Sequence, residues 1–450
     1  MTARAIASAG PRIPQPLLRV NVADTLVWSE YCFLLCIAVA LALVVVPPDW
    51  PLPGRRAIRH LPLLATIPLA ILSIAGRRLS TPSMPYPPGR ASVSILMPLV
   101  LLGAWIVVGS AHARWVEGFQ ATFLNLGLYI VAAPAAALIV ANSAAPFKLA
   151  HSFLQLIVIA AICMMLGLVS VYGHRELYHE QIFMLIPAAV ALMISRQHRG
   201  YAWIGFAFVV AAALLSRKNT SYLIALLSTV YVAAFLWLNV MRRASSTKQL
   251  WMHYLAFTGV LLIAAAGCYL LYFKEHYLPS GNTEFRTFTY RAAWQQFLQS
   301  PIWGTGFSEE SIRKFTLYSI GISRNRLPTH SDVMDLLANG GLLAIGLWAW
   351  SYLRVGTFAY TRVLAPRHLH YPWAPHVHTF AMISLAAIVV YAFNPILLQP
   401  EMAFLAWTTL GFLVGLAASC DPQAYAGNAT DIAHYMRTVN SRTAPERGRA

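Results

Sequence analysis

A series of long apolar runs constrains the fold of this chain more than any other feature. Hydrophobic residues make up 58% of its 450 residues and charged residues only 11%, whereas soluble domains place about a quarter of their residues in Asp, Glu, Lys and Arg. A helix that crosses a bilayer needs about 20 mostly apolar residues. We therefore expect an all-α polytopic integral membrane protein with about 12 transmembrane helices, rather than a soluble enzyme, a disordered chain or a small disulfide-stapled domain. The predicted spans lie near residues 26–46, 61–76, 92–110, 119–141, 149–172, 181–195, 200–215, 219–240, 251–273, 332–353, 376–398 and 402–419.

These runs also predict how the chain is organised. Residues 26–419 form the transmembrane domain, between a cytoplasmic N-terminal tail at 1–25 and a cytoplasmic C-terminal tail at 420–450. The span at 61–76 is short and contains two prolines, so we expect it to be kinked or re-entrant.

The basic residues predict the orientation in the membrane. Because Lys and Arg concentrate in cytoplasmic loops, we place both termini inside: 19 of the 33 Lys and Arg residues then lie in inner segments and 14 in outer segments. Seven of those 14 belong to one long outer loop, residues 274–331. The formal net charge of +17 is thus mostly a topology signal, and we expect no nucleic-acid partner.

The outer loop 274–331 is the only extramembrane segment large enough to fold over a site. Its middle, YRAAWQQFLQSPIWGTGF, has helical spacing, and Ser300-Pro301 ends the helix before a Gly304-Thr305-Gly306 turn. We expect an amphipathic helix on the outer membrane surface. The alternative is a lid or linker helix without chemistry.

The next helix begins near THSDVMDLLANGGLLAIGLW, residues 329–348. Asp332 is expected at the N-cap or in the first turn. Gly340, Gly341 and Gly346 should let neighbouring helices approach closely. His330, at the membrane boundary, is either a simple interfacial residue or a functional one.

Arg217 and Lys218 form a basic pair in SRKNTSYLIA, at an outer turn, against the topological bias. A snorkelling pair is one explanation. The functional explanation is phosphate binding, for which the planar guanidinium is well suited. With the loop arginines and His330, the pair indicates an outer site where arginines bind an anion and a histidine acts as general base. Such chemistry requires no metal or cofactor, and the chain has no Asp-x-Asp pair.

Two histidine-containing segments offer alternative metal sites. HRELYHE at 174–180 lies in an outer loop but is not HExxH, and HLHYPWAPHVH at 368–378 lies on the cytoplasmic side. We favour substrate contact for the first segment and an interfacial connection for the second.

The order SRKNTSYLIA, then YRAAWQQFLQSPIWGTGF, then THSDVMDLLANGGLLAIGLW resembles the O-antigen ligase and polymerase superfamily over about residues 200–355. The resemblance implies a bacterial inner-membrane glycosyltransferase with a C-type, all-helical fold and a periplasmic loop at 274–331. It implies a donor glycan on undecaprenyl pyrophosphate and, for a ligase, a lipid A-core acceptor; a polymerase would extend a growing glycan. Membrane lipids are the remaining partners.

The resemblance also implies roles for individual residues. His330 would be the catalytic base, and Arg217 and Arg291 would bind the pyrophosphate, with Arg286 as a competitor and Lys218 beside them. Asp332 would orient His330 or cap its helix. Two positions depart from the family pattern. The chain has Ser331 where an asparagine is usual after the histidine, and Asn339 where an acidic residue often precedes the late glycine.

Three activities therefore remain open. An O-antigen ligase is favoured over a polymerase by the single large outer loop. A flippase or exporter of the lipid-linked glycan is disfavoured, because charged residues lie at span ends rather than within the spans.

Overall fold

The protein is described from a computed structural model, which covers residues 27–46, 54–80, 88–115, 123–170, 207, 211, 219–241, 247–277, 281–307, 329, 331–369, 373–394, 397 and 399–420. Throughout these residues the regular structure is helical, without a strand. The N-terminal helices are α1 (Trp28–Val45), α2 (Arg55–Ile58), α3 (Leu61–Ser80), α4 (Pro88–Trp115), α5 (Leu124–Leu128), η1 (Tyr129–Val131), α6 (Ala132–Asn142) and α7 (Pro146–Ser170). The later helices are α10 (Asn219–Met241), α11 (Thr247–Tyr277), α12 (Gly281–Gln299), α13 (Asp332–Ala359), η3 (Tyr360–Leu364), η4 (Pro366–His368), α14 (Ala374–Phe393) and α15 (Pro400–Ser419).

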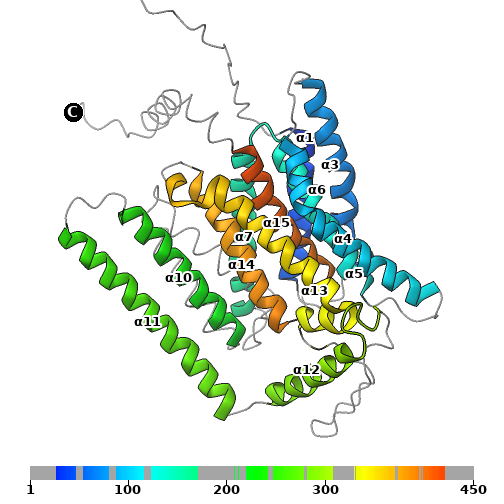
Figure 1. The fold of residues 1–450 in the computed structure, drawn as a ribbon. Helices are drawn as coiled ribbons and strands as arrows, with labels where there is room; N and C mark the ends of the chain where they lie inside the picture. Colours follow the sequence, from blue (N-terminus) through cyan, green and yellow to red (C-terminus); the bar gives the residue numbers. More distant parts are fainter. Residues whose placement is uncertain are drawn as a thin grey trace, which may run out of the picture.

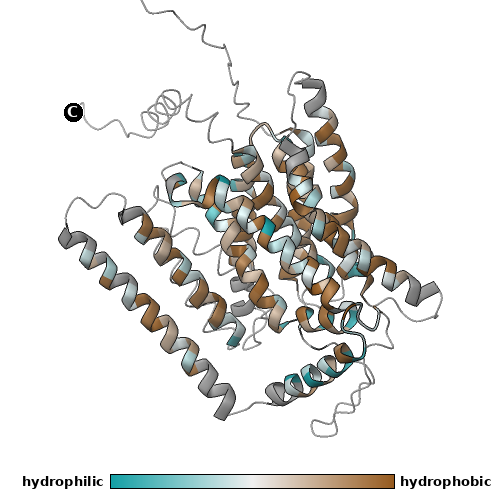
Figure 2. Ribbon diagram, viewed as in Figure 1, coloured by the Kyte–Doolittle hydropathy of each residue, from teal (hydrophilic) through white to brown (hydrophobic). Residues whose placement is uncertain are grey.

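The predicted fold class is confirmed. Ten of the twelve predicted spans coincide with these helices. Of the other two, 181–195 lies outside the described residues, and so does 200–215 apart from residues 207 and 211. In the described part of the chain, eight helices are long and apolar enough to cross a membrane, and shorter apolar helices occupy Leu61–Gly76 and Thr258–Leu270. Figure 2 shows apolar residues along the long helices and more hydrophilic ones on α12. The helix expected to be kinked or re-entrant, α3, runs from Leu61 to Ser80 with Pro68 inside it.

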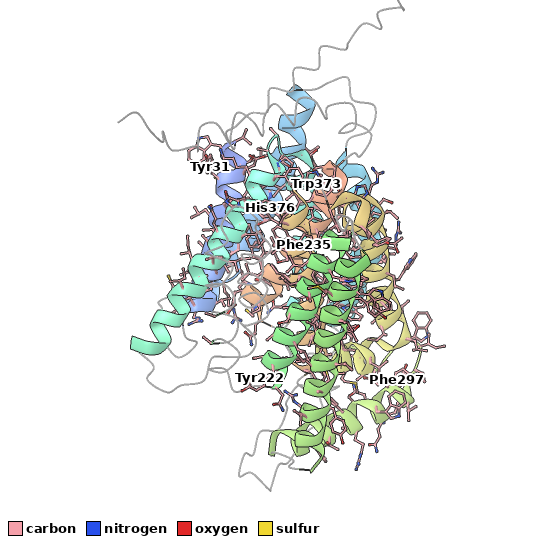
Figure 3. The ribbon with its side chains drawn as sticks, turned by 90° about the vertical axis from the view of Figure 1, so that its left-hand side faces the viewer. Tyr31, Tyr222, Phe235, Phe297, Trp373 and His376 are labelled. Atoms are coloured by element: carbon pink, nitrogen blue, oxygen red, sulfur yellow. The ribbon has the colours of Figure 1, made fainter. Side chains whose placement is uncertain are left out.

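The long helices form a bundle, with α12 across one end of it (Figure 1). We call this the loop end. Figure 3 places Tyr222 of α10 and Phe297 of α12 at this end, while Tyr31 of α1, Trp373 and His376 lie at the opposite end. This agrees with the alternation of span directions expected from the sequence. Which end faces the cytoplasm remains a prediction, as does the division into tails and a transmembrane domain.

Helix α15 is the centre of the bundle. Nearly nine-tenths of its residues are buried (89%), and it packs against α6, α4, α1 and α14. The contact with α6 is close because two glycines face it. A Cβ atom on Gly411 would lie 2.8 Å from Cβ of Ala136, and one on Gly415 would lie 2.7 Å from Cβ of Val140. In a bilayer the hydrophobic effect does not drive helices together, so close packing at small residues contributes to their association. The N-terminal and C-terminal halves are therefore one packed unit.

Candidate functional site

Helix α12 is present where the sequence predicts it, but its apolar residues do not share one side. The buried side consists of Thr289, Ala293, Gln296 and Phe297, all less than a tenth exposed. The exposed side carries Phe288, Arg291, Trp294 and Leu298. The prediction of a simple amphipathic helix is therefore wrong in this respect. The physical reason is that the inward polar side chains form hydrogen bonds, whereas the outward aromatic ones suit a lipid interface.

The two arginines of α12 point to different sides. Arg286 lies one turn before Thr289, on the inward side, and is partly buried, whereas Arg291 is exposed. The Nε atom of Arg286 is buried and has no hydrogen-bond partner in the described part of the chain. A buried donor without a partner is costly, so Arg286 is the arginine of α12 that a ligand could satisfy.

Tyr290 accompanies Arg286 on the inward side, and sequence reasoning missed it. Its hydroxyl donates a hydrogen bond to the carbonyl of Ala392 in α14 (3.4 Å). Burial raises the pKa of Tyr290, and the positive charge of Arg286 opposes that rise. The phenol is thus a neutral group beside a cation, and it ties α12 to α14. The only sequence signal was its position in the YRAAW motif.

Helix α13 is interrupted at Gly341, which has φ 64° and ψ −161°. Such a break leaves backbone groups without partners inside the helix. The residues after α12, 300–307, form a turn that lies against the break and that we call the 300–307 turn. In it, the N–H groups of Thr305 and Gly306 donate to the carbonyls of Ala338 and Asn339, at 3.2 and 3.0 Å.

The other side of the break is satisfied in the same way. The N–H groups of Leu342 and Leu343 donate to the carbonyls of Pro301 and Ile302, at 2.8 and 3.1 Å. Irregular backbone within a membrane protein is tolerated where protein groups pair with it. The break in α13 and the 300–307 turn therefore depend on each other, so the loop helix α12 is fixed relative to α13.

Glycines make this approach possible. A Cβ atom on Gly341 would lie 2.5 Å from both the nitrogen of Gly304 and the carbonyl oxygen of Ile302, and one on Gly340 would lie 2.8 Å from the ring of Phe307. The expected close approach is thus confirmed for Gly340 and Gly341. For Gly346, the described part of the chain has no atom within 4 Å of a Cβ built there, so it shows no close approach at that residue.

Two buried amides reinforce the contact. The side chain of Gln296 donates to that of Asn339 (3.1 Å), and Asn339 donates to the carbonyl of Asp335 (2.7 Å). Gln296 also donates to the hydroxyl of Thr305. Asn339, one of the departures from the family pattern, therefore has a structural role here that needs both an acceptor and a donor.

The first turn of α13 is held from two sides. Ser331 is the N-cap: its hydroxyl accepts from the N–H of Met334 (3.2 Å). Asp332 is fully buried in the first turn, where its carboxylate accepts from the N–H of Leu397 (3.0 Å). Of the two places expected for Asp332, the first turn is confirmed and the N-cap is wrong, because a hydroxyl one residue earlier already fills that position.

The residue that precedes His330 is anchored to α12. The hydroxyl of Thr289 donates to the carbonyl of Thr329 (3.2 Å), and the N–H of Thr329 donates to the carboxylate of Asp335 (3.2 Å). Ser331, on the other side of His330, also donates to the carbonyl of Tyr391 in α14 (3.4 Å). Both neighbours of His330 in the chain are thus fixed by hydrogen bonds at the loop end.

Three of the predicted site residues, Arg217, Lys218 and His330, lie outside the described residues. Arg217 and Lys218 directly precede α10, and Tyr222 in the first turn of α10 lies at the loop end (Figure 3). The described part of the site is therefore the inward side of α12, the 300–307 turn and the start of α13.

The described residues contain no group of three or more His, Cys, Asp or Glu side chains that could hold a metal ion. The segment HLHYPWAPHVH is at the opposite end of the bundle. There His376 lies 3.4 Å from His151, and His378 is 2.9 Å from the hydroxyl of Tyr231. The segment HRELYHE lies outside the described residues.

Comparison with known proteins bears on the same region. The family model described as O-antigen ligase matches residues 182–349, which include α10 to α12 and the break in α13. The match supports the O-antigen ligase and polymerase superfamily that the sequence motifs indicate. A search of curated proteins found no match to the chain.

Proposed function

We propose that this chain, a member of the O-antigen ligase and polymerase superfamily, is an inner-membrane glycosyltransferase of the ligase type. It would transfer a glycan from undecaprenyl pyrophosphate to lipid A-core on the periplasmic face. The observation that carries the proposal is the inward side of α12. There the buried Nε of Arg286 has no partner among the described residues and lies one turn from the residue that anchors Thr329.

The reaction is a direct displacement at the anomeric carbon of the donor. His330 takes the proton of an acceptor hydroxyl, and the hydroxyl oxygen attacks the anomeric carbon. The bond from that carbon to the pyrophosphate oxygen breaks, and undecaprenyl pyrophosphate leaves with the extra negative charge. Arginines stabilise this charge as it develops, since paired guanidinium hydrogen bonds are strongest to anionic oxygens.

We assign different parts of this task to the arginines. Arg286, inward and partly buried, would bind the pyrophosphate next to His330, with Arg217 and Lys218 reaching the same end from the start of α10. Arg291 lies on the exposed side among Phe288, Trp294 and Leu298. There an apolar surface beside a cation suits a phosphate carried on a lipid tail, so Arg291 would meet the donor at the bilayer surface.

The test compares the arginines in one assay. We expect His330→Ala and Arg286→Ala to abolish transfer by the purified, folded protein, and Arg286→Lys to restore only a small part of it, because lysine cannot form paired hydrogen bonds. Arg291→Ala should mainly raise the KM for the lipid-linked donor. The exposed Gln295→Ala on the same helix is the control and should be fully active. Full activity of His330→Ala or Arg286→Ala would overturn the mechanism.

The polysaccharides of a deletion strain separate the activities. Loss of a ligase leaves long glycans on the lipid carrier, whereas loss of a polymerase leaves single repeats on the final acceptor. Cytoplasm-facing intermediates would instead indicate a flippase. Accumulation of long carrier-linked chains is the result that the proposal requires.

A further inference from the structure

A second polar cluster lies at the start of α3, outside the segment matched by the family model. It consists of Arg59, His60, Tyr129 and Glu401. The Nδ1 atom of His60 is 2.7 Å from the hydroxyl oxygen of Tyr129, which in turn donates to the carbonyl of Arg59 (3.3 Å). The phenol has one proton for these two contacts, so the donor of the His60–Tyr129 hydrogen bond depends on the tautomer of His60, and the other ring nitrogen stays available to a ligand. The imidazole is thereby held in one orientation.

The charged groups of the cluster are not paired with each other. The Nε atom of Arg59 and the Oε2 atom of Glu401 are buried and lack hydrogen-bond partners in the described part of the chain. Yet Arg59, His60 and Glu401 are each only partly buried as residues, so the cluster remains open to the outside. Unpaired buried polar atoms are costly in a finished fold, and a polar ligand would satisfy both.

Burial lowers the pKa of His60, the charge of Arg59 acts in the same direction, and that of Glu401 opposes it. The imidazole is therefore neutral at neutral pH. The cluster then offers one guanidinium, one carboxylate and one neutral imidazole. This set suits a ligand that has both an anionic group and hydroxyl groups, rather than a bare anion.

The cluster lies close to the start of α13. Glu401 follows Leu397 by four residues, and Leu397 donates to Asp332 (3.0 Å), which is two residues after His330. Four residues span at most about 14 Å, so Glu401 is within that distance of Leu397. The cluster is therefore near the end of the bundle at which α13 begins.

The positive charge of this segment also needs an explanation. Arg55, Arg56 and Arg59 fall in an outer segment by the alternation of spans, against the cytoplasmic bias of basic residues. Arg55 has a structural role, because it donates to the carbonyls of Leu43 and Val46 at the end of α1. No such contact accounts for the side chain of Arg59 among the described residues.

We propose that Arg59, His60 and Glu401 form a subsite for a phosphorylated sugar of the acceptor glycolipid. Arg59 binds the phosphate through its guanidinium, Glu401 accepts hydrogen bonds from sugar hydroxyls, and the free ring nitrogen of His60 forms a hydrogen bond with a further hydroxyl. The inference rests on the proposed function, since it assigns the acceptor to a cluster separate from the arginines of α12.

The first experiment measures binding without transfer. The full-length protein is placed in phosphatidylcholine nanodiscs and titrated with lipid A-core, either intact or stripped of its phosphates. We expect Arg59→Ala to lower affinity for the intact glycolipid about tenfold, the loss of one charged hydrogen bond, and to leave affinity for the stripped glycolipid unchanged. Glu401→Gln should weaken both. Arg362→Ala, which removes an exposed arginine near the opposite end of α13, is the control and should change neither.

Kinetics give the second readout. Arg59→Ala should raise the KM for the acceptor while the KM for the donor stays within about twofold. Because Tyr129 bonds to the carbonyl of Arg59 and not to its side chain, the variant keeps that hydrogen bond. Equal affinity of Arg59→Ala and the parent protein for the intact glycolipid would overturn the subsite. The same variants are also tested for binding of phosphatidylglycerol in nanodiscs that contain no glycolipid. If Arg59→Ala weakens that binding as much as it weakens binding of the intact glycolipid, the cluster binds bulk lipid instead. If transfer fails altogether while the binding difference persists, the proposed function is wrong and the subsite stands.

Discussion

Gly304 is the position at which the contact between the 300–307 turn and α13 can be tested most sharply. Its φ is +76°, and a Cβ atom there would lie less than 3.0 Å from the backbone of Asn339 and Gly340. Neither neighbour can move without displacing the break in α13. Gly304→Ala should therefore separate the 300–307 turn from α13. The backbone N–H and carbonyl groups that pair between the two segments would then lose their partners.

The magnitude follows from what would be lost. Four backbone hydrogen bonds join the turn to the break, and each contributes about 1 kcal/mol net. A left-handed backbone adds roughly 1–2 kcal/mol for alanine. We expect a total loss of about 5–6 kcal/mol, together with loss of transfer, since α12 would no longer be fixed relative to α13.

Gly306 provides the matched control. It also has a positive φ, +96°, but no atom of the described residues lies within 4 Å of a Cβ built there. Gly306→Ala should therefore lose only the roughly 1–2 kcal/mol of backbone strain. The assay is thermal unfolding of the purified full-length proteins in detergent, combined with their level in the membrane. If the two variants were equally stable, the pairing between the turn and the break would not hold the loop as described.

Four further predictions test separate contacts. Gly411→Leu should severely reduce the amount of folded protein, because the leucine side chain would clash with the backbone of α6. The control is Gly259→Leu in α11, which should be tolerated because no atom of the described residues lies within 4 Å of a Cβ built there. Size-exclusion profiles in detergent distinguish the two variants. Ser331→Ala removes the N-cap of α13 and should cost about 1 kcal/mol in a thermal melt, and an unchanged melt would exclude the capping role. Asn339→Asp keeps the acceptor for Gln296 but loses the donor to Asp335, so it should be less stable at pH 8 than at pH 5, where protonation restores a donor; a pH-independent difference would argue against this. Transfer should persist in EDTA, and inhibition that a divalent cation reverses would count against metal-independent chemistry.

Much of this structure could be predicted from local patterns, and the rest depends on contacts between distant segments. Long apolar runs identify spans because a bilayer demands them, and Ser300-Pro301 marks the end of α12 because proline cannot continue a helix. The break at Gly341 has no such local signal. Two adjacent glycines are equally compatible with an unbroken helix that packs closely against a neighbour. Whether the helix breaks depends on its contact with the 300–307 turn, about 40 residues earlier in the chain.

The same limit applies to the candidate site. Spacing places Arg286 and Arg291 on different sides of a helix, yet it does not say which side faces inward. That choice follows from the hydrogen bonds of Thr289 and Gln296, whose partners are in α13 and the segment before it. The cluster around Arg59 was not predicted, because it joins α3, η1 and α15 across more than 300 residues of sequence.

The central position of α15 has a consequence for biosynthesis. Among the described helices, α15 is the most buried and is also the last in the sequence, so the earlier described spans enter the membrane before α15 is available to pack against α6. During that interval the alanine-rich face of α6 is exposed to lipid or to the insertion machinery. A nascent chain that stops before residue 400 should therefore be recognised as incomplete and degraded, although His330 and the arginines of α12 have by then been synthesised.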